Sequence, residues 1–327
     1  MKKLWELRRK PLSLCLRLAV LLSAGIVAFI ILFLVGYILV KGIPHLTPSL
    51  FEWTYNSENV SLMPALVNTL IMTMLSLIIA APLGIFSAIY LVEYARRGNK
   101  LVSVVRMAAE TLAGIPSIVY GLFGSLFFVF ALKMGLSLLS GAFTLAIMIL
   151  PLIMRTTEEA LLSVSDTYRE GSFGLGAGRL RTVFSVVLPS AVPGILAGVI
   201  LAVGRVVGET AALIFTAGTV AKIPKDMFSS ARTLSVHMYI LSGEGFYINQ
   251  TYATAVVLLL LVVCVNALSG LAAKKIAGGN GALAKPGRKA KPRRYSEPAS
   301  AAAAGLAARP PGTEQGDSFK FREKSNE

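Results

Sequence analysis

Long uncharged apolar blocks constrain this chain more than any other feature. Residues 18–40 contain no charged side chain, and they are as long as the roughly 20 residues that a helix needs to cross the hydrocarbon core of a bilayer. Because that core offers no water, the backbone must satisfy its own polar groups, which an α-helix does within one segment. The chain is 55% hydrophobic and 15% charged, against about 25% charged in a soluble domain. We therefore expect an all-α, polytopic membrane protein.

Six long apolar blocks occur along the chain, two of which also hold charged residues in their interior. The first stands alone, and the other five lie within a core domain at residues 64–275. Residues 278–327 are rich in Gly, Pro, Ala and Arg and have no apolar period, so we expect a disordered basic tail, either solvated or lying against anionic lipid headgroups. We expect membrane-spanning helices at residues 18–41, 65–90, 107–131, 136–154, 192–216 and 253–273.

The basic residues set the expected orientation. The chain has 32 Lys and Arg against 17 Asp and Glu, a formal charge of +15. These cations gather in residues 1–17, 96–106 and 155–181, whereas the connections on the other side hold few. Since cytoplasmic loops carry the excess of Lys and Arg, we expect residues 1–17 to be a cytoplasmic N-terminus and the C-terminus to be cytoplasmic too. The apolar run that follows residue 17 is too long for a signal peptide.

Composition also argues against other classes. The basic residues flank apolar blocks and form no aromatic-interleaved basic face, so we expect no nucleic-acid binding. The two cysteines, Cys15 and Cys264, and the two histidines, His45 and His237, are far apart in the chain, and we expect no metal site. A membrane-embedded enzyme would need a convergent nucleophile or acid/base set, and the apolar blocks hold too few polar residues for one.

Residues 155–190 form the longest predicted cytoplasmic loop before the tail. Apolar residues recur at helical spacing in 157–168 and again in 179–188, with glycines between them, which predicts two short helices joined at the glycines. Such a unit can lay a helix into a groove on a partner protein; the alternative is a re-entrant connector. No Gly-Lys-Ser or Gly-Lys-Thr occurs in the chain, so the glycines form no phosphate-binding loop and the chain is not expected to bind ATP itself.

The fifth predicted membrane helix carries an arginine and a glutamate, Arg205 and Glu209. An arginine near the bilayer centre costs about 2.5–3.5 kcal/mol on insertion scales, which makes it a functional candidate. Its planar guanidinium can donate two parallel hydrogen bonds to an oxyanion, so we expect both residues to line a pathway for an anion. The alternative is a structural ion pair at i,i+4. Gly204 and Gly208 form one of two small-xxx-small pairs that predict close helix packing.

Pro116 interrupts the third predicted membrane helix. Proline lacks an amide hydrogen and commonly kinks a membrane helix. We expect Ser117 to line the pathway beside this kink. Glu110, near the inner end of the same helix, is expected to have a structural role, paired with an arginine of a partner subunit or bonded to nearby amides.

The 155–190 loop carries a spaced motif that resembles a known one. The pattern is similar to the EAA loop of ABC importer permeases, which reads Glu-Ala-Ala, three residues, Gly, nine residues and Ile-x-Leu-Pro. The spacing agrees throughout, although a glycine and a serine replace the two alanines and a valine replaces the isoleucine. The resemblance implies a coupling helix that docks on a cytoplasmic ATPase. The residues that carry it are Glu170, Gly171, Ser172, Gly176, Val186, Leu188 and Pro189.

Two longer stretches narrow the resemblance. Residues 108–124, AAETLAGIPSIVYGLFG, and residues 198–218, GVILAVGRVVGETAALIFTAG, are similar to the phosphate-specific permeases. GETAALIF, together with ARTLSVHMYIL at 231–241, resembles the A-type (PstA-like) subunit more than the C-type. The resemblance covers roughly residues 64–275.

This resemblance implies the type I ABC importer permease fold and a heterodimer with a C-type permease subunit. It also implies two cytoplasmic ATPase subunits, which bind ATP and Mg, and an external phosphate-binding protein, so that this chain itself binds no cofactor and is not an enzyme. The implied function is alternating-access import of inorganic phosphate across the plasma (inner) membrane of a prokaryote, with this chain a multi-pass subunit in contact with lipid. The alternatives are a permease for another oxyanion, such as sulfate or molybdate, or a secondary transporter, which commonly has paired inverted repeats; no second Arg205–Glu209 pattern occurs.

Overall fold

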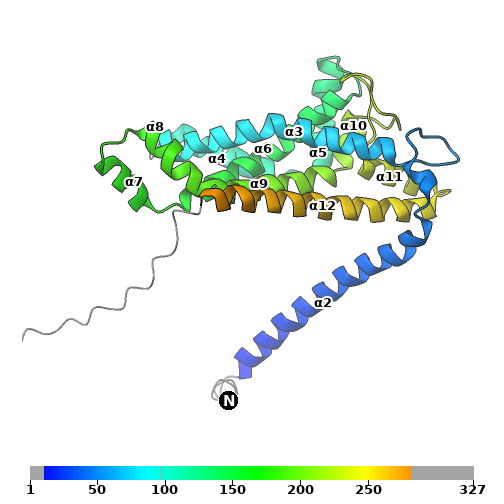
Figure 1. Cartoon of the computed structure of the whole chain (residues 1–327), viewed down its shortest axis with the longest axis horizontal. Coiled ribbons are helices and arrows are strands. Elements are labelled where there is room, and N and C mark those ends of the chain that lie inside the picture. Colours follow the sequence, from blue (N-terminus) through cyan, green and yellow to red (C-terminus); the bar gives the residue numbers. More distant parts are fainter. Residues whose placement is uncertain (1–10, 97, 281–327) are drawn as a thin grey trace, which may run out of the picture. The chain divides into compact units, whose positions relative to one another are not determined.

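The computed structural model describes residues 11–96 and 98–280, and every regular element within these ranges is a helix (Figure 1). The all-α prediction is confirmed for this part of the chain. Predictions for residues 1–10 and 281–327 lie outside the described residues. The α-helices are α2 (Pro11–Gly42), α3 (Met63–Ile89), α4 (Lys100–Ala113), α5 (Ser117–Gly124), α6 (Leu138–Leu162), α7 (Asp166–Gly174), α8 (Arg179–Thr182), α9 (Leu188–Val207), α10 (Ala211–Thr216), α11 (Leu234–Glu244) and α12 (Ile248–Asn280).

Several of these helices are extended by wider π-helical turns. The turn η3 (Tyr90–Tyr94) continues α3, η4 (Ser125–Ala131) continues α5, and η5 (Val183–Val187) joins α8 to α9. Five uninterrupted described segments are long and apolar enough to cross a membrane. They are Cys15–His45, Met63–Tyr94, Leu138–Leu162, Arg179–Val207 and Ile248–Leu271.

Helices α3 and α6 form the centre of the bundle, and α9 packs on both of them. Figure 1 shows these helices running alongside one another, with α12 beside α9. Met72 of α3 and Leu145, Ile149 and Ile153 of α6 are almost completely buried there, together with Ala202 of α9. Between helices in lipid, such contacts stabilise by van der Waals packing rather than by removal of water.

Two glycines of α9 allow it to approach α6 closely. A Cβ built at Gly194 would lie 2.7 Å from the Cβ of Ala160, and one at Gly198 would overlap the Thr156 side chain. Both are closer than real side chains come, so these positions require a residue without a Cβ. This is the small-residue packing that membrane helices use.

Replacing Gly198 with leucine is therefore expected to force α9 away from α6. Overpacking of this kind typically costs about 1–3 kcal/mol, so the purified protein should unfold at a lower temperature and give less monodisperse material in size-exclusion chromatography. Gly270→Leu in α12 is the matched control, because nothing lies within 4 Å of a Cβ built there. Equal loss of thermal stability in both variants would contradict this packing.

Gly204 and Gly208 do not pack as the sequence predicted. A Cβ at Gly204 would come no nearer than 3.6 Å to Asn266, and one at Gly208 would lie 3.7 Å from the Gly204 carbonyl. Both distances are ordinary van der Waals distances, so neither position requires a residue without a Cβ. Gly204 faces the side chain of Asn266, and Gly208 lies at the C-terminal end of α9. Gly208 thus marks where α9 stops rather than where it touches a neighbour.

The predicted helix at residues 107–131 is broken rather than kinked. Helix α4 ends at Ala113, and the axis turns by 104° between Lys100–Ala113 and Ser117–Ala131. The residue before a proline is driven out of the helical region by the proline ring, so the chain leaves the helix before Pro116 and restarts at Ser117. The described residues contain six membrane spans if this bent pair of helices is counted as one span, and five if it is not. A hydrogen bond connects the two helices of the pair: the hydroxyl of Tyr120 in α5 donates to the carbonyl of Leu112 in α4 at 2.7 Å.

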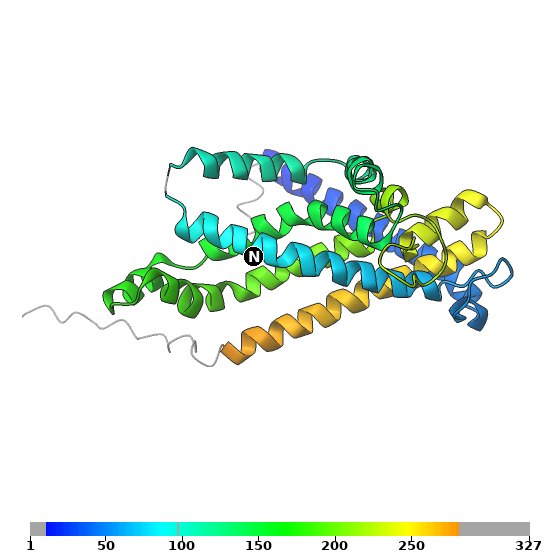
Figure 2. The same cartoon turned by 90° about the horizontal axis from the view of Figure 1, so that it is seen from above.

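Glycines of α5 show where the chain goes after this turn. A Cβ at Gly121 would lie 2.8 Å from the Cα of Ala212, and one at Gly124 would lie 2.9 Å from Thr216 Cγ2. Helix α5 therefore packs tightly on α10. Figure 2, seen from above, shows α5 almost end-on while the long helices run across the view.

The other predicted boundaries differ in length. Helix α6 continues past residue 154 to Leu162, and α12 spans Ile248–Asn280 instead of 253–273, so residues 278–280 of the expected tail are helical. The predicted helix at 192–216 is two helices, α9 and α10, separated by residues 208–210. Residues 179–188, predicted as a separate short helix, are continuous with α9 in Arg179–Val207. The short helix predicted at residues 157–168 is divided between the end of α6, which runs to Leu162, and the start of α7 at Asp166. The 155–190 segment therefore contributes only α7 as an independent helix.

Candidate functional site

Helix α7 lies at one end of the bundle and carries the first part of the spaced motif. It follows α6 after residues 163–165 and lies beside α8 (Figure 1). None of its residues is buried. The long helices are held together by their buried side chains, whereas α7 has none and is held by polar contacts. Most of the surface of α7 is therefore exposed.

The motif glycine Gly176 ends α7. It has a φ of +83°, a left-handed conformation that L-residues with a Cβ rarely adopt. Its amide donates to the Phe173 carbonyl at 2.9 Å, and the amide of Ala177 donates to the Ser172 carbonyl at 3.1 Å. These bonds satisfy the last carbonyls of the helix, which is the usual function of a glycine just past a helix C-terminus.

Gly176→Val is expected to destabilise the C-terminal end of α7. Holding a residue with a Cβ in the left-handed region costs about 1–2 kcal/mol, which corresponds to a roughly 5–30-fold larger opened population. Arg179 and Arg181 follow the turn and are exposed, so tryptic cleavage after them should accelerate. Gly174→Ala is the control, since Gly174 is helical and nothing lies within 4 Å of an added Cβ. Similar cleavage rates for the two variants would contradict this assignment.

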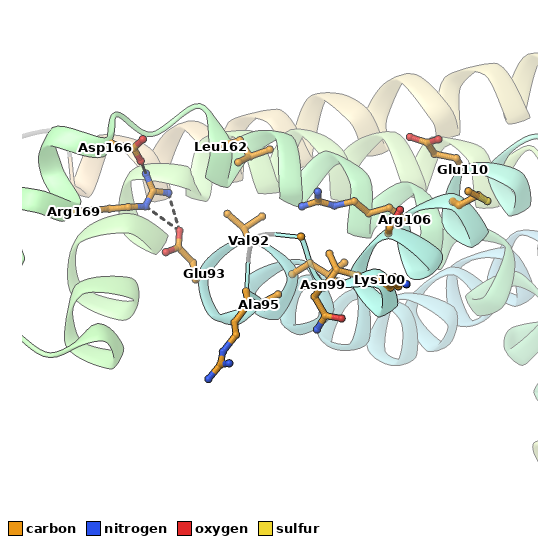
Figure 3. A pocket seen from close by; sticks show the side chains of 16 residues that line it. Val92, Glu93, Ala95, Asn99, Lys100, Arg106, Glu110, Leu162, Asp166 and Arg169 are labelled. Atoms are coloured by element: carbon orange, nitrogen blue, oxygen red, sulfur yellow. Dashed lines mark hydrogen bonds and ion pairs between the residues drawn. The ribbon is translucent and has the colours of Figure 1, made fainter. Parts of the chain in front are cut away.

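Arg169 fixes α7 to the bundle (Figure 3). Its Nη2 and Nε donate to Oε1 of Glu93 at 2.7 and 3.2 Å. Its Nη1 donates to the Val164 carbonyl at 2.7 Å and to Asp166 Oδ1 at 3.1 Å, and Nη2 donates to the Leu161 carbonyl at 2.9 Å. A guanidinium has five N–H donors, and here all of them are used. Sequence reasoning missed this arginine and its glutamate.

A second polar contact attaches the other side of α7. The hydroxyls of the motif residue Ser172 and of Thr182 in α8 are 2.8 Å apart. Thr182 is buried and is followed by the buried Val183 and Val187 of η5. The contact therefore connects α7 to the beginning of the segment that continues as α9.

The outward surface of α7 and α8 combines a carboxylate with apolar side chains. Glu170 is exposed, and the exposed fractions of Leu175 and Leu180 are 91% and 65%. Tyr168, Phe173 and Phe184 are exposed on the same segment. Large apolar side chains that are this exposed to solvent, outside the bundle, indicate a surface that binds a partner protein. The other motif residues, Val186, Leu188 and Pro189, are half-buried at the start of α9 and so join this surface to the bundle.

A hollow of about 940 Å³ lies beside Arg169. Figure 3 shows the side chains that enter it from the end of α3, from α4, from the end of α6 and from α7. Arg106 and Glu158 form an ion pair at 2.5 Å at its margin. Glu110 also lines the hollow and is exposed; it forms no ion pair with another described residue. Glu110 therefore faces this hollow on α4 and is not part of the break at Pro116.

Arg205 and Glu209 do not form the ion pair that the sequence allowed. Helix α9 ends at Val207, so the helical phase that brings i and i+4 together is lost before Glu209. The buried Glu209 instead accepts a hydrogen bond from the amide of Ala212 at 3.1 Å, which satisfies the start of α10. Its carbonyl accepts a bond from Ser235 of α11 at 2.5 Å. Glu209 therefore orders the α9–α10 junction.

Arg205 is half-buried and bonds to no other described side chain or backbone group. It lines a groove of about 600 Å³ between α6, α9 and α12. Gly204 and Asn266 share this groove, and its other lining residues are apolar. A cation with free donors beside an amide, in an otherwise apolar groove, can receive an oxyanion. Sequence reasoning missed Asn266, which has no local motif.

Ser117 and Pro116 lie elsewhere. Pro116 is the N-cap residue of α5, and Ser117 is the first residue of that helix and half-buried. Neither lines the groove of Arg205. The sequence placed Ser117 and Arg205 on one pathway, and the structure does not bring them into one groove.

The opposite end of the bundle holds a buried histidine. Burial first, and then the positive charge of Arg232, lower the pKa of His237 in α11 to about 4. The ring is therefore neutral at physiological pH and its Nδ1 can accept from Arg232 Nη1 at 3.3 Å. Arg232 in turn lies 5.5 Å from the centre of the Tyr55 ring. Nowhere among the described residues do three His, Cys, Asp or Glu side chains gather as metal ligands.

Comparisons with known proteins agree with this geometry. Residues 80–278 match the family described as binding-protein-dependent transport system inner membrane component. The chain is 36% identical over 242 residues to the probable ABC transporter permease protein YqgI of Bacillus subtilis (strain 168), which covers 68% of this chain and 81% of that relative. It is 32% identical over 275 residues to the phosphate transport system permease protein PstA of Yersinia pestis, which covers 83% and 91%.

Solved structures show the same fold. A chain of a bacterial alginate ABC transporter, in complex with an alginate pentasaccharide-bound periplasmic protein, superposes with a TM-score of 0.57 at 16% identity, over 83% of this chain and 97% of that one. The inward-facing MetNI methionine ABC transporter gives a TM-score of 0.51 at 19% identity, over 73% and 96%. The chain therefore belongs to the family of binding-protein-dependent transport system inner membrane components and has the type I ABC importer permease fold.

Proposed function

We propose that this chain is the A-type permease subunit of an ATP-driven importer of inorganic phosphate. The observation that carries the proposal is α7, a motif-bearing helix with no buried residue that is tied to the bundle by polar bonds. The substrate class is supported by relatives named phosphate transport system permease protein PstA, among them those of Yersinia pestis and Haemophilus influenzae at 32% identity.

In this proposal α7 docks on a separate cytoplasmic ATPase. Glu170 and the exposed apolar residues of α7 and α8 supply the docking surface, Gly171 leaves room for close approach, and Gly176 ends the helix. Two ATPase subunits bind ATP and Mg and carry out hydrolysis, while this chain binds no cofactor. Closure of the ATPases would then move α7, and the membrane helices would move with it.

The other partners follow from the same proposal. A C-type permease subunit forms the second half of the membrane channel, and an external phosphate-binding protein delivers the anion. The bundle end that carries α7, the N-terminus and the C-terminus all face the cytoplasm, in keeping with the excess of Lys and Arg near them. The protein is a multi-pass component of the inner membrane of a prokaryote.

Arg205 is the proposed contact for the anion, with Asn266 beside it. A guanidinium that bonds to no other described residue can bond to phosphate oxygens in a bidentate manner. Glu209 acts on the pathway only by ordering the α9–α10 junction. Ser117 lines a separate stretch of the anion pathway, near the break between α4 and α5.

The test is uptake of radiolabelled phosphate into proteoliposomes that hold this chain, the C-type permease and the ATPase, with the binding protein outside and ATP inside. Uptake is expected to require ATP and to stop when the ATPase carries a substitution that prevents hydrolysis. Sulfate and molybdate in tenfold excess should leave roughly nine tenths of the phosphate uptake, which corresponds to binding about a hundredfold weaker than that of phosphate. Competition by either anion would make it the substrate, and uptake without ATP would indicate a secondary transporter.

A further inference from the structure

We propose that Arg169 is a positioning residue that transmits movement of α7 to α3 through Glu93. The proposal rests on the proposed function, because it assigns the route by which a docked ATPase acts on the bundle. Glu93 lies 76 residues before Arg169, in the η3 turn that ends α3. The pair is therefore a tertiary connection between the helix that docks and a central helix of the bundle.

The environment of the pair makes the connection strong. The side chains of Arg169 and Glu93 are only 14% and 9% exposed, so the ion pair is little screened by solvent. Breaking one partner of such a pair leaves an unpaired charge in a poorly solvated place, which a surface pair does not do. Two guanidinium nitrogens, Nη2 and Nε, donate to the same oxygen, Oε1 of Glu93, so loss of this one carboxylate would leave two donors without a partner at once.

Arg169 holds three elements at once. Its bonds to the carbonyls of Leu161 and Val164 satisfy the end of α6, its bonds to Glu93 reach η3, and its backbone belongs to α7. The chain itself joins α7 only to α6 and, through residues 175–187, to α9. Without Arg169, the polar bonds of the described residues would leave α7 with no connection to α3.

The lack of burial in α7 gives this bond its mechanical importance. None of the α7 residues is buried, and the elements on which α7 packs are η5 and α8, so hydrophobic packing provides no direct connection from α7 to α3. Helix α3, by contrast, packs along α6 over most of its length. A displacement that reaches Glu93 therefore enters α3 directly, whereas a displacement carried only by the chain enters α6 and α9 and reaches α3 only through their packing on it.

Lysine cannot replace this arginine. An ammonium has three donors on a flexible stem, while the guanidinium offers five in one plane. Arg169→Lys would keep the charge and lose the simultaneous contacts to η3 and to the end of α6. We therefore expect Arg169→Lys to resemble Arg169→Gln rather than the wild type.

The experiment uses the complete transporter in proteoliposomes and measures the phosphate transported for each ATP hydrolysed. Arg169→Gln and Glu93→Gln are each expected to lower this ratio by about tenfold, as for a lost coupling of typical size. Co-purification of the ATPase and basal hydrolysis should persist. The double variant should be no worse than either single one, since both remove the same interaction. Asp166→Asn is the matched control and should keep the wild-type ratio, because Asp166 is 76% exposed.

A second measurement reports the connection without transport. Spin labels on Tyr90→Cys in η3 and Phe173→Cys in α7, both exposed positions, are placed in a chain whose Cys15 and Cys264 are replaced by serine. Electron-resonance distance measurement should give one narrow distribution with Arg169 and a broad one with Arg169→Gln. A distribution that stays narrow in Arg169→Gln overturns the proposal, as does a wild-type transport ratio in that variant.

A purely structural role would appear differently. Arg169→Gln would then lose the ATPase from the purified complex, and this outcome also overturns the proposal. Failure of the wild type to take up phosphate would contradict the proposed function instead. In that case the spin-label distances still decide whether Arg169 holds α7 to α3.

Discussion

Replacing Arg205 with glutamine is expected to remove most phosphate uptake while the transporter assembles normally. Hydrogen bonds to charged groups contribute about 1.5–3 kcal/mol each, so the loss of a bidentate pair, about 3–6 kcal/mol, should lower uptake by roughly a hundredfold or more. Assembly should survive because Arg205 is half-buried in a groove and bonds to no other described residue. The measurement is initial uptake rate in proteoliposomes, with the amount of assembled complex determined by size-exclusion chromatography.

Glu209→Gln separates this interpretation from a structural ion pair. Glu209 and Arg205 are not paired, and the carboxylate accepts a bond from the Ala212 amide, which a glutamine oxygen can also accept. Glu209→Gln should therefore keep most of the uptake. Similar losses in both variants would mean that the two residues act as a pair. Arg205→Lys should be intermediate, because it keeps the charge and loses the planar fork. Normal uptake by Arg205→Gln would remove Arg205 from the pathway.

Glu170→Lys is expected to abolish both ATPase co-purification and uptake without unfolding the permease. Glu170 is exposed on a helix with no buried residue, so the substitution touches nothing that holds the bundle together. Reversing a charge within a docked interface can cost several kcal/mol, which is more than a tenfold loss of affinity. The measurement is the ATPase recovered with affinity-tagged permease, together with the thermal unfolding midpoint of the permease alone.

Glu244→Lys is the matched control. Glu244 is also an exposed glutamate on a helix, the last residue of α11, and Figure 1 shows α11 at the other end of the bundle from α7. It should retain the ATPase and the uptake. Retention of the ATPase by Glu170→Lys would contradict the docking assignment. Loss of the ATPase accompanied by a lower unfolding temperature would mean that the permease itself was damaged.

The local order of the segment around α7 could be predicted only in part. The motif spacing identified the segment, and Gly176 does end a helix there. The sequence also predicted a second independent helix at 179–188, which was wrong, because these residues continue into α9. Apolar periodicity shows that a stretch is helical but contains no information on whether the next helix begins in line with it.

The break at Pro116 could likewise be predicted only in part from the sequence. A proline in a membrane helix predicts an interruption, and the interruption is present. Its size, 104°, depends on where α5 finds its packing surface. Gly121 and Gly124 allow α5 to lie close to α10, and α10 is almost a hundred residues later in the chain. No local signal could have given that direction.

The sequence by itself determined that this chain is a bundle of membrane helices and that a segment at residues 155–190, interrupted by glycines, carries the motif. These properties follow from local physics: hydrocarbon permits only backbones that satisfy themselves, and a glycine ends a helix through its own dihedral angles. Only the tertiary structure decided that Arg205 stands apart from Glu209, that Asn266 shares its groove, and that Arg169 meets Glu93. These contacts join segments distant in the chain, or depend on where a helix stops, and both are set by how the helices pack against one another.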